Sequence, residues 1–309
     1  MRRLIVILVL ALIVVSCKPG EQKAVSLTAP FIGGTQGLSV AFQDFRADVF
    51  DGGLDPFDVI VKLENKGEAL VAKEDVKVKL SGINPAEFDK SEADLTKNAP
   101  DDIIENRLQE TGVLPGPPVF VDFIGLNHKG SIAGASAGFT LRADVCYLYR
   151  TRAVSKLCVR ENLLTPRAGG ICEINEAKPV YNSGAPIQIS KFEEIARAKD
   201  KLGFSFEIKN VGSGNVFERN SKCDRSERRF ENRVYVAIGT GLPGLSCTGL
   251  ESTALGVEGF VTLYGGSKII SCAQPISTRS DFEQIVGVEV VYDYEQSIQS
   301  TFNVKSSGE

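Results

Sequence analysis

The sequence predicts an all-β protein in which two tandem antiparallel β-sandwich domains follow an N-terminal signal or anchor segment. Three features predict this: an apolar leader, an internal repeat, and short runs in which apolar and polar residues alternate. The 309-residue chain is 43% hydrophobic and 24% charged, a globular composition sufficient for two cores. Its net charge of −4, without a concentrated basic stripe, gives no support to a nucleic-acid partner.

The N-terminal segment has the features of a signal peptide. Two arginines precede a run of twelve apolar residues, 4–15, and the sequence VVS leads into Cys17 as in a lipoprotein cleavage box. The run is shorter than the roughly 20 residues of a membrane span and has the length of a signal-peptide core. We therefore expect an exported protein, with 1–17 as signal peptide or membrane anchor and 18–30 as a polar tether.

Cys17 has three alternative fates. Cleavage before it would make it the new N-terminus, and lipidation of its thiol would tether the protein to the membrane. We favour this outcome over an uncleaved anchor and over free secretion. The expected location is therefore the outer face of the cytoplasmic membrane or the cell surface.

An internal repeat appears when the chain is compared with itself at a shift of 145 residues. Residues 56–70 (PFDVIVKLENKGEAL) align with 201–215 (KLGFSFEIKNVGSGN), and both contain Asn-x-Gly. Residues 145–159 align with 290–304, and both contain Tyr-x-Tyr. Two gapless matches at one shift indicate a tandem duplication.

The duplication divides the chain into domains at 31–160 and 171–305, joined by a linker at 161–170 where Pro and paired Gly interrupt the patterning. The second domain contains a charged insertion, 218–232, because the strand after it aligns at a shift of 158 rather than 145 residues. We expect one helical turn near 101–108.

The strands are predicted from period-two alternation. Residues 57–63 and 204–208 alternate apolar with polar side chains and run into the Asn-x-Gly turns. The further expected strands are 76–80, 119–124, 139–149, 153–159, 234–238, 259–264, 268–272, 286–294 and 300–304. Short strands at turn-punctuated intervals are typical of β-sandwiches.

The strand followed by Asn-x-Gly reads KLENKGEA in the first half and EIKNVGSG in the second. This pattern, with the strand rhythm, resembles the CARDB-like immunoglobulin-fold modules of prokaryotic cell surfaces. The resemblance implies two tandem Ig-like sandwiches used in adhesion or as a spacer on an envelope protein. It transfers no functional residue, because the Asn-x-Gly is a turn.

Six cysteines remain beside the anchor, and an even number in an exported chain predicts disulfides. They are Cys146, Cys158, Cys172, Cys223, Cys247 and Cys272. Their closest spacing of twelve residues disfavours a zinc site, which requires close pairs.

The repeat suggests how the cysteines pair. Cys146 and Cys158 are both replaced at the equivalent positions of the second half, so we expect them to bond to each other across a hairpin that turns at 151–153. The remaining four allow three pairings. Among these we favour Cys223–Cys247 with Cys172–Cys272.

Catalytic motifs are weak. Ser136 lies in GASAG, which matches the G-x-S-x-G of a hydrolase, but a strand follows it and His128 precedes it, so a small-residue turn is the better interpretation. We expect His128 to be solvated in a loop. A hydrolase using Ser136 is the minor alternative, and we predict that the protein is not an enzyme.

Two other groups of polar residues have a binding alternative. Asp44, Asp48, Asp51 and Asp55 surround paired glycines, but they lack the calcium-loop spacing, so we favour a solvated turn over calcium near Asp51 and predict no metal or cofactor. The insertion carries interspersed charges, with arginines at Arg219, Arg225, Arg228, Arg229 and Arg233. Mixed signs favour a solvated face, yet a loop on a rigid scaffold is where binding residues concentrate.

These features predict a non-catalytic, membrane-tethered cell-surface protein for binding, adhesion or envelope structure. Its expected partners are the membrane, through the N-terminus, and a surface protein or glycan. A subunit of a larger surface assembly, paired through exposed strand edges, is the alternative.

Overall fold

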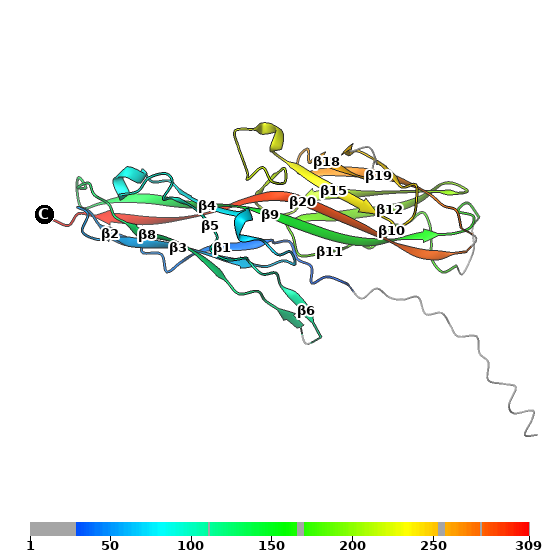
Figure 1. Cartoon of the computed structure of the whole chain (residues 1–309), viewed down its shortest axis with the longest axis horizontal. Helices are drawn as coiled ribbons and strands as arrows, with labels where there is room; N and C mark the ends of the chain where they lie inside the picture. Colours follow the sequence, from blue (N-terminus) through cyan, green and yellow to red (C-terminus); the bar gives the residue numbers. More distant parts are fainter. Residues whose placement is uncertain (1–28, 111, 166–169, 253–256, 279, 309) are drawn as a thin grey trace, which may run out of the picture.

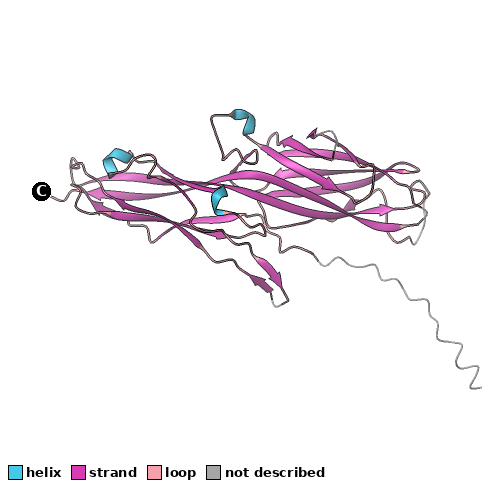
Figure 2. Ribbon diagram, in the orientation of Figure 1, coloured by secondary structure: helices cyan, strands magenta, loops and turns pink. Residues whose placement is uncertain are grey.

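The computed structural model describes residues 29–110, 112–165, 170–252, 257–278 and 280–308. These residues form an all-β protein, as predicted, with short 3-10 turns as its helical elements (Figure 2). The turns are η1 (Lys73–Asp75), η2 (Pro85–Phe88) and η3 (Arg228–Phe230). In the described part of the chain, no helix is long and apolar enough to cross a membrane. Residues 101–108 are extended rather than helical.

Two strands of 24 residues each run along the middle of the elongated molecule, β9 (Ser136–Val159) and β20 (Phe282–Lys305) (Figure 1). They pair antiparallel over their whole length without a register shift. At about 3.3 Å per residue, the pair spans roughly 80 Å. The hairpin predicted to turn at 151–153 is wrong, because β9 passes straight through it.

The long pair forms the centre of a ten-stranded sheet. Its main order is β17-β18-β15-β20-β9-β4-β5, with β2, β11 and β14 pairing at its margins. The remaining members are β17 (Glu251–Ser252), β18 (Glu258–Thr262), β15 (Arg233–Gly239), β4 (Val76–Ser81), β5 (Thr96–Asn98), β2 (Asp48–Phe50), β11 (Tyr181–Asn182) and β14 (Asn215–Phe217). Each half of the sheet contributes one layer to one sandwich.

Two smaller sheets supply the second layer. Both pack against the same face of the long sheet, because every odd-numbered residue of β9 from Leu141 to Val159 is buried. One contains β1 (Leu38–Gln43), β3 (Phe57–Asn65) and β8 (Val119–Leu126). The other contains β10 (Ala177–Lys178), β12 (Ile187–Ala198), β13 (Lys201–Asn210), β19 (Ser267–Pro275) and β16 (Ser246–Thr248). A short hairpin, β6 (Arg107–Gln109) with β7 (Gly112–Leu114), projects from the body (Figure 1).

The topology of the strands supports the duplication. β3 and β13 are each the central strand of a small sheet, while β4 flanks β9 as β15 flanks β20. The 145-residue shift also maps Leu148 onto Asp293, which is its register partner in the long pair. A pseudo-twofold axis therefore passes between these two residues.

The Asn-x-Gly turns are equivalent in detail. The Asn65 side chain donates to the Ala69 carbonyl at 2.7 Å and accepts from the Gly67 N–H at 3.0 Å. Asn210 makes the same two bonds four and two residues ahead, at 3.0 and 3.1 Å. The structure thus confirms that both motifs are turns.

The two halves interlock. The first part of β9 completes the sandwich of the first repeat, and its second part lies in the sandwich of the second repeat, opposite the reciprocal parts of β20. The expected separation at 161–170 therefore does not hold: the chain reaches it only after β9 has crossed into the second sandwich. Residues 166–169 lie outside the described residues.

Four tyrosines fill the seam where the two sandwiches meet. They are Tyr147, Tyr149, Tyr292 and Tyr294. All are at most 2% exposed, and neighbouring ring centroids lie 5.7 to 6.5 Å apart. Their hydroxyls bind the backbone of both repeats: that of Tyr147 accepts from the Leu38 N–H at the start of β1, and that of Tyr294 accepts from the Gly214 N–H just before β14. Buried hydroxyls need such partners, so these bonds fix the two segments against the seam.

Gly67→Ala tests the packing of this seam. A Cβ at Gly67 would overlap the Gly184 carbonyl oxygen and the Tyr149 hydroxyl, so the backbone must move. We expect the free energy of unfolding, measured with urea, to fall by about 3 kcal/mol. Gly239→Ala is the matched control, because its Cβ meets no atom within 4 Å, and it should change stability by less than about 0.5 kcal/mol. Equal effects of the two variants would contradict the close approach.

Candidate functional site

All six predicted cysteines of the body form disulfides, but the pairing differs from the expected one. The bonds are Cys146–Cys223, Cys158–Cys172 and Cys247–Cys272. The predicted Cys146–Cys158, Cys223–Cys247 and Cys172–Cys272 bonds are therefore wrong. Twelve residues of uninterrupted strand hold Cys146 and Cys158 about 40 Å apart, whereas a disulfide needs Cα atoms within about 7 Å. Cys17 lies outside the described residues.

The structure does not bring Ser136 and His128 together as a catalytic pair. Ser136 is exposed at the start of β9, opposite Lys305 in the register. His128 is only 4% exposed, so the expectation of a solvated histidine is wrong. Its ring packs against Phe88 and Phe139, at centroid distances of 5.2 and 5.8 Å.

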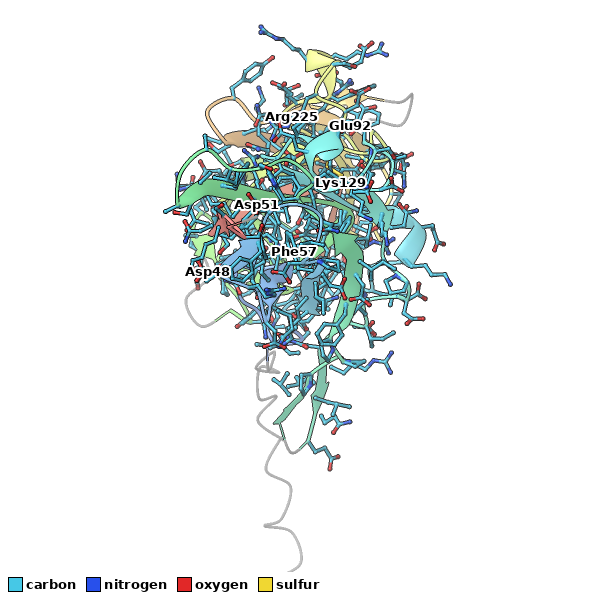
Figure 3. All side chains as sticks on the ribbon, turned by 90° about the vertical axis from the view of Figure 1, so that its left-hand side faces the viewer. Asp48, Asp51, Phe57, Glu92, Lys129 and Arg225 are labelled. Carbon is cyan, nitrogen blue, oxygen red and sulfur yellow. A yellow bond between two sulfur atoms is a disulfide. The ribbon has the colours of Figure 1, made fainter. Side chains whose placement is uncertain are left out.

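The aspartates near the paired glycines form hydrogen bonds and ion pairs with other residues of the protein. Asp51 is buried and accepts from the Ile132 and Ser307 N–H groups, both at 2.7 Å, and these bonds lower the pKa of its carboxyl. Asp48 binds Lys305 at 2.8 Å at the same end of the molecule (Figure 3). Asp55 binds Arg46 at 2.8 Å. Within the described ranges, no group of three potential metal ligands is present.

The predicted insertion, 218–232, is a loop between β14 and β15 that stands above the middle of the molecule, where its η3 turn appears yellow in Figure 1. Cys223 in this loop bonds to Cys146 on β9, so the insertion of the second repeat is attached to the first. Lys222 adds an ion pair with Asp75 at 2.9 Å, also in the first repeat. The loop therefore bridges the pseudo-twofold axis.

Asp293 anchors the loop from below. It is 2% exposed and accepts from the Asn220 N–H at 3.0 Å, the Lys222 N–H at 2.6 Å and the Ser221 hydroxyl at 3.3 Å. Burial raises the pKa of its carboxyl, and the hydrogen bonds oppose that rise. A buried carboxyl with three local donors specifies one loop conformation.

The backbone at this anchor is unusual. Asn220, Lys222 and Cys223 have φ values of 64°, 55° and 54°, in the left-handed region that non-glycine residues seldom adopt. Such conformations persist where several surrounding contacts hold the backbone in place. They are frequent at binding sites. Here the disulfide and Asp293 provide the constraint.

A cleft of about 510 Å³ lies between the loop and the outer face of the long sheet. Its lining is polar and charged apart from the disulfide. The lining residues are Lys77, Lys79, Ser81, Asp144, Cys146, Ser221, Lys222, Cys223, Asp224, Arg225 and Glu295. The positions of its four cations and three carboxylates across β4, β9, β20 and the loop were not predictable from the sequence, because the register that aligns them was not known.

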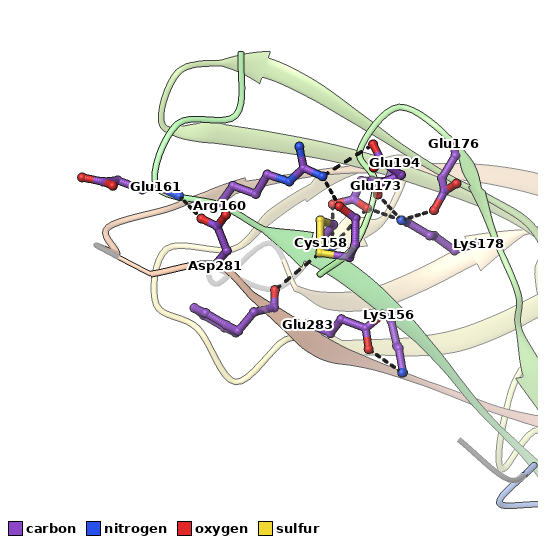
Figure 4. Close-up of a disulfide and its surroundings, with 12 residues drawn as sticks. Lys156, Cys158, Arg160, Glu161, Glu173, Glu176, Lys178, Glu194, Asp281 and Glu283 are labelled. Carbon is purple, nitrogen blue, oxygen red and sulfur yellow. Dashed lines mark hydrogen bonds and ion pairs between the residues drawn. A yellow bond between two sulfur atoms is a disulfide. The ribbon is translucent and has the colours of Figure 1, made fainter. Parts of the chain in front are cut away.

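A second cluster of charges lies beside the Cys158–Cys172 disulfide (Figure 4). Glu194 on β12 is 1% exposed; its carboxylate accepts from the Cys158 N–H at 2.9 Å and faces the Lys178 ammonium at 3.2 Å. Burial, the dominant influence, raises the pKa of Glu194 to about 7. This cluster supports the fold of the second sandwich, and its adjoining pocket is smaller, about 280 Å³.

Comparison with known proteins gives weak likenesses. No protein-family model and no curated protein matches the sequence. Among solved structures, envelope protein VP37 from White Spot Syndrome Virus is similar at 10% identity and a TM-score of 0.24, over 47% of this chain and 97% of that one. A serine-rich repeat adhesion glycoprotein from Streptococcus agalactiae has 9% identity and a TM-score of 0.17, over 87% and 96% of the chains. Likenesses at this level assign neither a family nor a function.

Removal of the Cys146–Cys223 bond should lower the stability of the protein and loosen the inserted loop. It closes a loop with a sequence separation of 77, which contributes about 4.5 kcal/mol by the chain-entropy relation, against about 3 kcal/mol for the separation of 14 at Cys158–Cys172. Cys146→Ser/Cys223→Ser should lower stability and increase amide exchange within 218–232. Cys158→Ser/Cys172→Ser should leave that exchange unchanged. Non-reducing peptide mapping that joins Cys146 to Cys158 would refute the pairing.

The raised pKa of Glu194 predicts that the free energy of unfolding depends on pH. Its folded-state pKa of about 7 lies above the unfolded value of 4.5, so between these pH values the folded protein retains a proton that the unfolded chain has released. The free energy of unfolding should therefore fall by about 3 kcal/mol as pH rises from 4.5 through 7. Glu194→Gln should remove this part of the slope while the contribution of Asp293 remains. Equal slopes in urea titrations of parent and variant would contradict the assignment.

Proposed function

We propose that this is an exported, membrane-tethered cell-surface protein that acts without catalysis, as a stiff module for binding, adhesion or envelope structure. The observation that supports it best is the complete pairing of β9 with β20 across both sandwiches. Linked domains normally move relative to each other, because few contacts cross their boundary. Here two continuous strands and the Cys146–Cys223 bond cross it.

Three disulfides support export, because such bonds persist in oxidising compartments and are rare in the cytosol. The proposed tether is a lipid on Cys17. The described chain begins beside the middle of the elongated molecule (Figure 1). A tether at this point would leave both ends of the molecule accessible to partners. We further propose that the two sandwiches are Ig-like modules of the CARDB-like kind.

A binding role fits the geometry better than a catalytic one. The strained, disulfide-bonded loop and its cleft form a pre-organised surface, and rigid surfaces lose little conformational entropy when they bind. Ser136 lies on a strand start with no helix after it, which is not the setting of a nucleophile elbow.

One observation favours the alternative of a larger surface assembly. The projecting β6–β7 hairpin exposes Leu108, Val113 and Leu114 by 56%, 48% and 50%. An isolated two-stranded hairpin is only marginally stable in water, and apolar side chains on it are suited to a protein contact. Crosslinking on intact envelopes distinguishes the two: a discrete larger adduct that Leu108→Lys abolishes would favour the assembly.

The tether is tested at Cys17. Cys17→Ser should prevent lipidation, release the protein from the detergent phase of a phase-partition extraction and leave the disulfide-bonded body folded. A body that stays accessible to an impermeant label on whole cells confirms surface location in the parent. A Cys17→Ser protein that partitions like the parent would overturn the lipid anchor and favour an uncleaved segment.

A further inference from the structure

We propose that the cleft beneath the inserted loop binds a carboxylate-bearing saccharide. This inference rests on the proposed function, because it names the ligand class for the binding surface described there. The site combines elements of both repeats: β4 and β9 come from the first, and β20 and the loop come from the second. It is therefore complete only in the interlocked fold.

The floor of the cleft is an ordered array on the outer face of the long sheet. Lys77 pairs in register with Cys146, and Lys79 with Asp144. Cys146 is in turn the register partner of Glu295 on β20. Alternation along β4 buries its valines and exposes both lysines on this face. The roof is the loop segment that the disulfide holds.

Most charges in the cleft already have partners. Arg225 is bound to Glu295, Lys222 to Asp75, and Asp144 to Arg142. Lys77 forms no ion pair within 4 Å in the described chain. Its charge adds a small contribution to the lowered pKa of Asp224, which is due mainly to hydrogen bonds from Ser226. Among the described residues, the ion-pair partner of Lys79 is Glu92 at 3.7 Å, and the two side chains are 50% and 73% exposed. Exposed pairs of this kind contribute little, so the two neighbouring ammonium groups are available to an anion.

The remaining polar groups identify the kind of anion. Asp144, Asp224 and Glu295 place carboxylate oxygens beside the lysines. Ser81 and Ser221 add hydroxyl oxygens, whose hydrogens are donated to Asp144 and Asp293. A compact phosphate dianion would be repelled by these carboxylates. Each acidic residue of a saccharide carries a single, delocalised negative charge for the lysines and several hydroxyl donors for the carboxylates. Since apart from the disulfide the lining is polar, an apolar ligand does not fit.

The site is pre-organised. Three left-handed residues, the Asp293 anchor and the Cys146–Cys223 bond hold the roof before any ligand arrives. A flexible loop would lose conformational entropy when it binds a ligand, whereas this loop is already ordered in the folded protein.

The test is calorimetric titration of the disulfide-intact protein with oligomers of galacturonate, oligomers of mannuronate and a hyaluronan tetrasaccharide. A neutral galactose oligomer and inorganic phosphate serve as comparison ligands. We expect at least one acidic saccharide to bind tenfold or more tightly than the neutral oligomer and phosphate. Lys77→Gln/Lys79→Gln should weaken that binding at least tenfold, and Lys77→Arg/Lys79→Arg should largely retain it.

Lys201→Gln/Lys209→Gln is the matched control, because it removes two exposed lysines from β13 in the other layer. It should bind like the parent, and thermal unfolding should show that all variants fold. No binding by any acidic saccharide, equal binding of phosphate, equal competition by an oligoglutamate peptide, or unchanged binding by the Gln variant would each overturn the proposal. Such a result would leave the surface-labelling test of the proposed function unaffected.

Discussion

The antiparallel pairing of β9 with β20 is the interaction on which the rest of the structure depends. It joins the two repeats into one sheet and aligns the four tyrosines at the seam. It also places each repeat's last strand partly in the sandwich of the other. Neither sandwich has a complete layer without the other repeat. The duplication therefore produced one interlocked body rather than two independent domains joined by a linker.

The pseudo-twofold symmetry is broken at the axis itself, and the candidate site lies at that break. The axis relates Leu148 to Asp293. In the second repeat the carboxyl at this position binds the backbone of an insertion that the first repeat lacks. The insertion crosses the axis, bonds to Cys146 and roofs a cleft over the β4 lysines. A single aspartate and a single cysteine thus direct an added loop onto the other half of the molecule.

Local patterns predicted much of the fold. The all-β class, the duplication and the charged insertion were predictable because period-two alternation, Asn-x-Gly and Tyr-x-Tyr are local features. The continuity of β9 was not predicted, because the expected bond between Cys146 and Cys158 required a hairpin turn at 151–153. In the structure Thr151 points inward and hydrogen-bonds Tyr292 at 3.0 Å, which keeps the alternation intact.

The disulfide pairing and the burial of His128 were both predicted wrongly. A supposed hairpin placed Cys146 near Cys158, whereas the continuous strand separates them and leaves Cys146 beneath the loop. His128 has loop-like neighbours in sequence, yet distant Phe88 and Phe139 bury it. Contacts between segments far apart in the chain decided both outcomes, and one sequence alone does not reveal them.

The central claim, that the shared strand pair makes both repeats one cooperative unit, is tested most directly by scanning calorimetry of the Cys146→Ser/Cys223→Ser variant. This variant lacks the covalent bond between the repeats, so any coupling must come from strand pairing and packing. The account predicts a single transition whose calorimetric and van't Hoff enthalpies agree. Two resolved transitions, one for each sandwich, would contradict it.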